Sequence, residues 1–218
     1  MNVLLLGATG MVGQGVLREC LLDAGVTRVV TLGRSATGQQ HDKLREIVRD
    51  DLKNLAPIEH QLRGFDACFD CLGVSAAGMT EERYTNLTFD LTLAVARNLA
   101  RLNPSMTFIY VSGMGTDSTE RGRTMWARVK GRTENAILQL PFSSYMFRPG
   151  LIVPLHGVTS RTSWYRAIYA VMTPLLPFLK RAFPTAITTT EQVGRAMLAV
   201  ARKGYRTRVL ESADIAGF

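Results

Sequence analysis

The sequence has little of what marks a secreted, metal-binding or membrane-spanning protein. Its three cysteines are too few for a disulfide scaffold, and an odd number fits a reducing compartment. The three histidines stand far apart, without the spacing of zinc ligands. The longest apolar run, residues 167–179, contains two prolines and is shorter than the roughly 20 residues of a transmembrane helix. The apolar opening lacks the basic residues of a secretory signal. We therefore expect a soluble, cytoplasmic protein without a bound metal.

Acidic residues are also scarce in one part of the chain. Lys and Arg number 26 against 18 Asp and Glu, which gives a net charge of +8. Residues 1–150 hold 17 basic and 15 acidic residues, whereas residues 151–218 hold 9 and 3. A uniformly basic nucleic-acid binder would not concentrate its excess in one segment. We expect no nucleic-acid partner.

Short apolar runs alternate with longer amphipathic segments along the first 150 residues. Continuous apolar runs are typical of buried parallel strands, and the amphipathic segments indicate helices on both faces of a sheet. Crossovers between parallel strands are right-handed, so the pattern predicts an α/β, doubly wound parallel sheet. The expected strands are residues 3–6, 28–32, 46–50, 67–71, 107–111 and 144–147, and the expected helices are residues 14–24, 81–102 and 124–140.

The alternation stops after Pro149. The rest of the chain contains a predicted loop at residues 153–160, a basic and aromatic segment at residues 161–181, and a predicted helix at residues 191–203. We expect one domain, 1–218, with a cofactor-binding core at 1–150 and a small C-terminal cap at 151–218. Segment 161–181 has three interpretations: a cap over a substrate pocket, a packing or homo-oligomer interface, and a patch that binds a membrane surface.

A glycine-rich turn joins the first strand to the first helix. Its glycines, at an interval of three residues, permit a tight turn, a close approach of backbone to a pyrophosphate, and close packing of the helix. The amides of the first helical turn then face the phosphates. The sequence therefore predicts a dinucleotide-binding loop, formed by Gly7, Thr9, Gly10, Met11, Val12 and Gly13.

The residue at the end of the second strand selects between cofactors. An Asp or Glu there would bind the ribose 2′-hydroxyl of NAD. This sequence has Arg34, 21 residues after Gly13, followed by Ser35. A guanidinium can pair with a 2′-phosphate, and a charge-assisted hydrogen bond contributes about 1.5–3 kcal/mol. We predict NADP as the cofactor, with NAD less favoured.

Cys68 and Cys71 have the spacing of a redox motif. Such a pair normally lies at a helix N-terminus, where the thiolate is stabilised. Here the spacing falls on a strand, where residues i and i+3 point to opposite faces. We expect no redox or metal role for the pair.

These residues resemble the extended and atypical branches of the short-chain dehydrogenase/reductase superfamily, including the NmrA-like proteins, the sugar-nucleotide epimerases and the Tat-interacting-protein oxidoreductases. The resemblance runs from residue 1 to about residue 152 and implies a Rossmann-type NAD(P)-binding fold. Asn86 matches an asparagine of the family. The further cofactor contacts that the resemblance implies are Asp51 and Leu52 at the adenine, Cys71, Leu72 and Gly73 at the ribose, Val111 at the end of the fifth strand, and Pro149, Gly150 and Leu151 at the nicotinamide.

The same resemblance implies a catalytic serine and lysine, but the family's tyrosine is missing. Ser112 matches the serine that orients a substrate carbonyl, and Lys130 matches the lysine that holds the ribose. The tyrosine position, four residues earlier on the same helix face, is Trp126. None of the six tyrosines has a lysine four residues on. An indole does not titrate, and a lost general acid typically costs about 10²- to 10⁴-fold in rate. A substitute acid could be Ser112, Thr124, Tyr165 or water.

Three functions are therefore consistent with the sequence. The first is an NADP-dependent oxidoreductase that acts on a small organic substrate. The second is a non-catalytic NADP(H)-binding regulator, which Trp126 keeps open, so whether the protein is an enzyme stays undecided. The third is a nucleotide-sugar epimerase or dehydratase, ranked last because only 68 residues follow Gly150. A basic mouth above a bound dinucleotide would attract an anionic cofactor or substrate.

Overall fold

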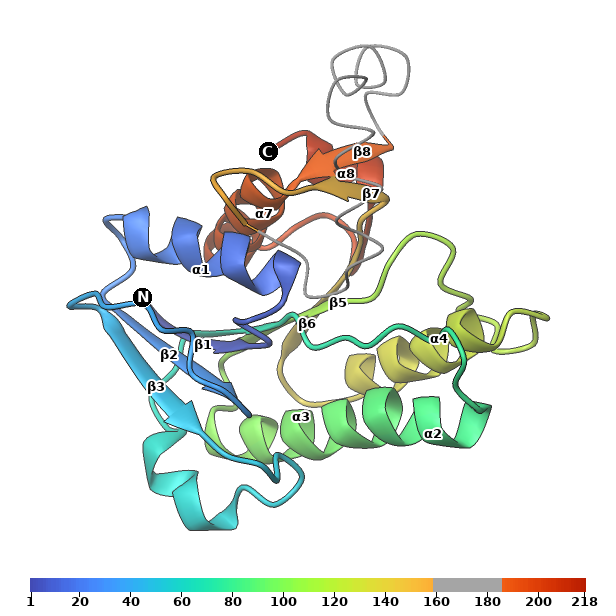
Figure 1. Cartoon of the computed structure of the whole chain (residues 1–218), viewed down its shortest axis with the longest axis horizontal. Coiled ribbons are helices and arrows are strands. Elements are labelled where there is room, and N and C mark those ends of the chain that lie inside the picture. The colour runs from blue at the N-terminus through green and yellow to red at the C-terminus, as the bar shows by residue number, and fades with distance from the viewer. Residues whose placement is uncertain (159–185) are drawn as a thin grey trace.

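A seven-stranded parallel sheet forms the centre of the computed structural model, which describes residues 1–158 and 186–218 (Figure 1). Its order is β3-β2-β1-β4-β5-β6-β9, so the winding reverses between β1 and β4. This order confirms the predicted doubly wound α/β fold. The strands are β1 (Asn2–Leu6), β2 (Arg28–Gly33), β3 (Leu44–Val48), β4 (Ala67–Asp70), β5 (Thr107–Val111), β6 (Ser143–Arg148) and β9 (Val209–Glu211).

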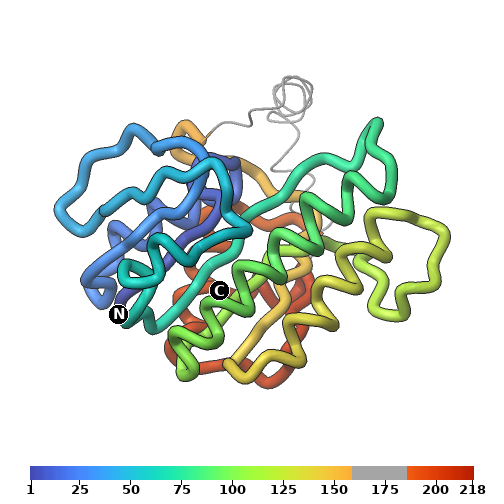
Figure 2. Tube along the Cα trace, turned by 90° about the horizontal axis from the view of Figure 1, so that it is seen from below, coloured from blue at the N-terminus to red at the C-terminus, as the bar shows by residue number. Residues whose placement is uncertain are grey.

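Helices cover both faces of this sheet. In Figure 1, α1 and α7 lie on one face and α2, α3 and α4 on the other, and Figure 2 shows α3 and α4 side by side. Val3 and Leu5 pack on the first face, whereas Leu4 and Leu6 pack on the second, so successive residues of β1 are all buried. The helices are α1 (Met11–Leu22), the 3₁₀-helix η1 (Ala56–Gln61), α2 (Glu81–Thr85), the π-helix η2 (Asn86–Asp90), α3 (Leu91–Leu102), α4 (Met125–Leu138) and α7 (Thr190–Lys203).

Most predicted elements are present, with boundaries that differ by a few residues. The third strand was predicted two residues too late, because β3 pairs with β2 from Leu44 onward. The first helix starts three residues earlier than predicted, directly after its N-cap Gly10. The predicted helix 81–102 is one helical run, with the π-helical turn η2 between α2 and α3. In the described part of the chain, no helix is long and apolar enough to cross a membrane.

The described C-terminal part adds to the main fold, and the division into a cofactor-binding core and a cap stays a prediction. β9 pairs with β6 as the last strand of the sheet, and α7 packs on α1. β7 (Leu151–Val153) and β8 (Ile187–Thr189) form a separate two-stranded sheet, and α8 (Ser212–Ala216) follows β9. These strands have three residues each, too short to show a periodic pattern. Segment 161–181, including Tyr165, lies outside the described residues, so its three interpretations stay predictions.

Candidate dinucleotide-binding site

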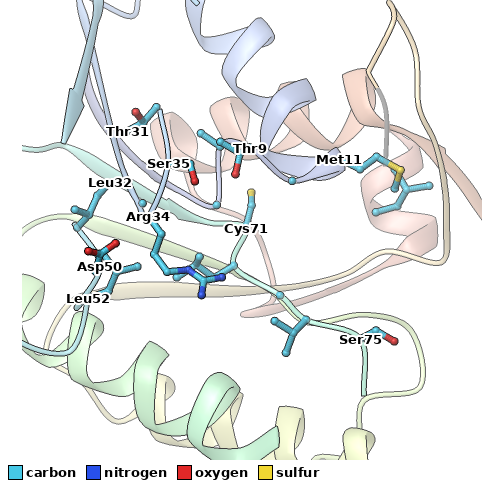
Figure 3. Close-up of a pocket in the computed structure, with 18 of the residues that line it drawn as sticks. Thr9, Met11, Thr31, Leu32, Arg34, Ser35, Asp50, Leu52, Cys71 and Ser75 are labelled. Carbon is cyan, nitrogen blue, oxygen red and sulfur yellow. The ribbon is translucent and has the colours of Figure 1, made fainter. Parts of the chain in front are cut away.

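A cleft of about 850 Å³ opens at the carboxyl ends of the strands, where the winding reverses (Figure 3). Doubly wound sheets bind ligands at this position. The structure brings together here these predicted contacts: Gly7, Thr9, Gly10, Met11, Arg34, Ser35, Leu52, Cys71, Leu72, Gly73, Gly150 and Leu151. The predicted residues that do not line the cleft are Val12, Gly13, Ser112, Val111, Asp51, Lys130 and Pro149.

The glycine-rich turn is shaped by close backbone contacts. Gly7 has φ +73°, and a Cβ there would lie 2.6 Å from the carbonyl group of Cys71. A Cβ on Gly13 would lie 2.1 Å from the Gly7 oxygen. Gly10 is the N-cap of α1, and no side chain caps this helix. The amides of the first helical turn have no partner within the helix, so they are suited to bind an anion. The residues present fit the pyrophosphate of a dinucleotide.

The end of β2 presents one cation to the cleft. Arg34 is exposed and forms no ion pair with a residue that the structure describes. Figure 3 shows its side chain extending across the cleft toward the segment after β4. The turn after β2 is held by Glu46 of β3, whose Oε2 accepts hydrogen bonds from Thr31 Oγ1 (3.2 Å) and Thr37 N (2.7 Å). Arg34 is therefore free to meet a negative group.

The acidic residue that lines this part of the cleft is Asp50, one position before the predicted Asp51. Asp50 and Leu52 line the cleft, whereas Asp51 turns to the chain beyond it and accepts hydrogen bonds from Lys53 N (2.8 Å) and Asn54 N (3.4 Å). The shift of β3 by two residues explains why Asp50 was missed. Thr31 also lines the cleft. It was missed in the sequence analysis because it lies within an apolar run that was interpreted only as a buried strand.

Cys68 in β4 and Cys71 directly after it lie on opposite sides of the sheet, as predicted. Cys68 is buried in the core on the α3 face, and Cys71 packs against the core on the α1 face. Both are free thiols. In Figure 3 the Cys71 sulfur points toward the glycine-rich turn, beside Thr9. Burial raises the pKa of both thiols well above the usual value, so neither carries a thiolate near neutral pH.

The hydroxyl of Ser112 is bound inside the protein. Ser112 follows β5 and is 7% exposed, and its Oγ donates to Glu134 Oε1. Glu134 is fully buried on α4 and pairs with Arg148 at the end of β6, whose Nε lies 3.0 Å from its Oε1. Arg148 also reaches Glu211 at 3.1 Å. This network ties α4, β5, β6 and β9 together, and the role of Ser112 at a substrate carbonyl stays a prediction.

Lys130 lies on the side of α4 that faces the sheet, near Asp70, a buried acid that the sequence analysis did not identify as a site residue. Its Nζ donates to the carbonyl oxygen of Ser112 and lies 6.0 Å from the centre of the Tyr110 ring. Burial lowers the pKa of Lys130 to about 8, against the charges of Glu134 and Asp70. Asp70 is completely buried at the end of β4. Its signal in the sequence was a charged residue inside an otherwise apolar strand.

Three further residues named in the sequence analysis lie outside the cleft. Trp126 is half-buried on the first turn of α4, and a Cβ on Gly115 would lie 3.7 Å from its indole. Asn86 is exposed and accepts a hydrogen bond from Lys53 Nζ at 3.2 Å. Thr124 is the exposed N-cap of α4. None of these three lines the cleft.

The chain has a relative whose sequence aligns over most of it. The protein named "fmp52, mitochondrial" of Emericella nidulans is 33% identical over 159 residues, which are 69% of this chain and 66% of that protein. The chain thus spans slightly less than two thirds of that relative's length. Two Aspergillus relatives of the same name are each 31% identical. Their names contradict the predicted cytoplasmic location, which is therefore wrong, because the cysteine count and the apolar runs on which the prediction relied do not distinguish the cytoplasm from the mitochondrion.

Solved structures share the fold at low sequence identity. MoeE5, solved in complex with UDP-glucose and NAD, superposes with a TM-score of 0.71 at 18% identity, over 96% of this chain and 74% of its own. WbmF of Bordetella bronchiseptica, solved in complex with NAD⁺, superposes with a TM-score of 0.68 at 15% identity, over 99% of this chain and 76% of its own. At such identities the likeness shows the fold alone, a Rossmann-type parallel sheet with helices on both faces.

The sequence itself matches a family. Residues 3–121, from β1 through the loop after β5, match the description "NAD dependent epimerase/dehydratase family". These residues include the glycine-rich turn, Arg34 and the segment after β4, which together line most of the cleft. The match confirms the resemblance to the extended and atypical short-chain dehydrogenases and supports a nicotinamide dinucleotide as the cofactor. The chain belongs to the NAD-dependent epimerase/dehydratase family.

Proposed function

We propose that the chain binds NADP(H) in the cleft and transfers hydride between its nicotinamide and a small organic substrate. The observation that carries the choice of NADP is Arg34, a cation at the end of β2 that lines the cleft and has no ionic partner among the described residues. An acid there would select NAD. The bound dinucleotide supplies or accepts the hydride, and the chain's residues hold and orient it.

The residues of the cleft divide this task. The first-turn amides of α1, next to Gly10, would hold the pyrophosphate. The Arg34 guanidinium would pair with the 2′-phosphate, and the hydroxyl of Ser35 would add a second donor. Gly150 and Leu151 lie on the side of the cleft formed by the segment after β6, where their backbone would meet the nicotinamide. A charge-assisted pair of about 1.5–3 kcal/mol corresponds to a preference of about 10- to 150-fold.

The choice of cofactor is tested by reversing the charge of Arg34. Arg34→Asp should weaken NADPH binding by at least 10-fold and leave NADH binding within a few-fold, as measured by nicotinamide fluorescence on titration. Arg63→Asp is the matched control, because Arg63 is exposed, carries the same charge and lies outside the cleft. Equal losses for the two dinucleotides, or no loss for either, would refute the assignment.

Trp126 favours a second candidate, a non-catalytic NADP(H)-binding regulator. The indole stands where the superfamily has its proton-donating tyrosine, and the Ser112 hydroxyl is bound to Glu134. The two candidates are separated by measuring NADPH binding and then NADPH consumption with aldehydes, ketones and quinones. Turnover by the wild-type chain supports the enzyme. Tight binding without turnover, unchanged in Trp126→Tyr, supports the regulator.

The family favours a third candidate, an epimerase or dehydratase acting on a nucleotide sugar. MoeE5 was solved with UDP-glucose, and this chain shares its fold. Incubation of the chain with UDP-glucose and catalytic amounts of dinucleotide would reveal a product without net NADPH consumption. A simple reductase would consume NADPH in proportion to its product, so the stoichiometry distinguishes the two.

A further inference from the structure

A carboxyl group lies buried directly behind the cleft. Asp70 is 0% exposed and ends β4, and its register partner on β5 is Tyr110. Its Oδ1 accepts a hydrogen bond from Leu72 N at 2.9 Å, in the turn that lines the cleft. Its Oδ2 is buried and has no hydrogen-bond partner among the described residues. Because an unpaired buried polar atom destabilises the fold, this oxygen calls for a functional explanation.

The lysine that acts on Asp70 comes from α4, one of the helices that cover this face of the sheet. Lys130 projects from α4, and its Nζ lies near the ring of Tyr110, the neighbour of Asp70. Asp70 and Lys130 are close enough to shift each other's ionisation. The other titratable groups that face this cluster are Cys68 and Cys71 on the β4 side, Tyr110 on β5, Tyr84 on α2, and Glu134 on α4.

The sheet order places this cluster at the nicotinamide end of the cleft. β5 lies between β4 and β6, and the segments that follow β4 and β6 both line the cleft. The Lys130 ammonium binds the Ser112 carbonyl, the first residue after β5, so it lies between these two segments. No other described lysine is placed there, since Lys43, Lys53 and Lys203 belong to other parts of the fold.

We propose that Lys130 is the proton donor of the reaction and that Asp70 is a positioning residue that acts through it. This inference rests on the proposed reductase function. In the reduction of a carbonyl, Lys130 donates one proton from Nζ to the oxygen as the carbon accepts a hydride. The C=O π bond breaks, a C–H and an O–H bond form, the substrate is reduced and NADPH is oxidised. The neutral amine then regains a proton from solvent, and the charge of Asp70 favours the protonated form of Lys130.

The ionisation of Asp70 and Lys130 agrees with these roles. Burial raises the pKa of Asp70 to about 7, although the Leu72 amide and the Lys130 charge oppose it. Burial lowers the pKa of Lys130 to about 8. An acid works best when its pKa is near the working pH, so the Lys130 ammonium is suited to donate a proton near neutrality. Neither Trp126 nor the bound Ser112 hydroxyl offers such a proton.

The pair is tested by measuring the ionisation of Lys130 directly. The chain has only five lysines, so NMR of ¹³C-labelled lysine side chains can be assigned with single Lys→Arg variants. We expect the Lys130 pKa to lie well below those of the others, and Asp70→Asn to lower it by about one unit more, because a negative neighbour is removed. Asp90→Asn, which changes an exposed acid on η2, should leave it unchanged. A wild-type Lys130 that titrates like the other lysines would overturn the proposal, even if Asp70→Asn does not fold.

A second readout uses the rate of carbonyl reduction against pH, with the best substrate of the aldehyde, ketone and quinone panel. The rate should fall as Lys130 loses its proton, and Asp70→Asn should move this fall to lower pH by about the same unit. Lys130→Met should lose 10²-fold or more in rate. An unmoved pH profile in Asp70→Asn contradicts the role of Asp70. NADPH titration of the same variants separates the outcomes: no binding by the wild type refutes the proposed function, whereas binding with an ordinary Lys130 pKa refutes only this inference.

Discussion

The two ends of the cleft are built by different means. The phosphate end consists of backbone: glycines whose missing side chains let the β1–α1 turn approach the end of β4, and amides at the start of α1. The end that we assign to the nicotinamide is flanked by charged side chains, of which Asp70 and Glu134 are buried and Lys130 and Arg148 are partly buried, and which come from three elements, β4, α4 and β6. The phosphate end depends on the absence of side chains at its glycines, whereas the nicotinamide end depends on the pairing of charged side chains. Substitutions at the two ends should therefore fail in different ways.

The largest effect is expected at the phosphate end. In Gly13→Val, the Cβ alone would lie 2.1 Å from the Gly7 oxygen, so the backbone of Gly7 or of α1 must move. We expect loss of NADPH binding below detection and a lowered Tm, measured by fluorescence titration and thermal unfolding. Gly217→Ala is the control, because its Cβ would meet atoms at 3.5 Å, an ordinary contact. Retained NADPH affinity in Gly13→Val would show that this end does not depend on space.

The next largest effect is expected in the charge network of the nicotinamide end. Glu134→Leu removes the buried partner of Arg148, whose side chain is 11% exposed, and leaves this cation only the half-exposed carboxylate of Glu211. The free energy of unfolding should fall by about 3–5 kcal/mol, measured by urea denaturation. A second substitution, Arg148→Met, should recover much of the loss, because no unpaired charge then remains. A double variant as unstable as the single one would show that packing, and not charge, holds this end.

The ionisation of Asp70 should make stability depend on pH. Its pKa is raised from 3.8 to about 7 in the folded chain, so the folded chain keeps a proton that the unfolded chain loses. Stability from this group is therefore present below pH 4 and lost as the pH rises toward 7, by up to about 4 kcal/mol at 1.36 kcal/mol per pKa unit. Asp70→Asn should lose less stability than the wild type between pH 4.5 and 7.5 in urea denaturation. Parallel curves would mean that Asp70 ionises normally.

The smallest effect concerns charge at the phosphate end. Asp50 is exposed and lines the same cleft as Arg34. Its carboxylate would repel a 2′-phosphate, so Asp50→Asn should strengthen NADPH binding by a few-fold, in line with about 0.2–1 kcal/mol for an exposed charge pair. NADH affinity should change less in the same titration. Weaker NADPH binding in this variant would give Asp50 a role in holding the cofactor.

The phosphate end could be predicted from the sequence because its chemistry is local. Gly7, Gly10 and Gly13 follow a strand and open a helix within seven residues, and Arg34 directly follows the next strand. Strand and helix periodicity likewise indicated six of the seven strands of the main sheet. The seventh strand and the small β7–β8 sheet were missed because strands of three residues show no period.

The nicotinamide end could not be predicted in this way. Glu134 stands four residues after Lys130 on α4, but it binds Arg148 and Ser112, which are distant in the chain. Asp70 showed only as an acid in an apolar strand, and its neighbours Tyr110 and Lys130 are 40 and 60 residues away.

The sequence by itself determined the doubly wound fold, the glycine-rich turn and the cation at the end of β2, because each depends on residues that are close along the chain. The tertiary structure decided which buried charges meet. It bound the Ser112 hydroxyl to Glu134, turned Lys130 inward, and left one oxygen of Asp70 without a partner among the described residues. The physical reason is that burial and pairing of charge are set by the packing of α4 on the sheet, which no short stretch of sequence encodes.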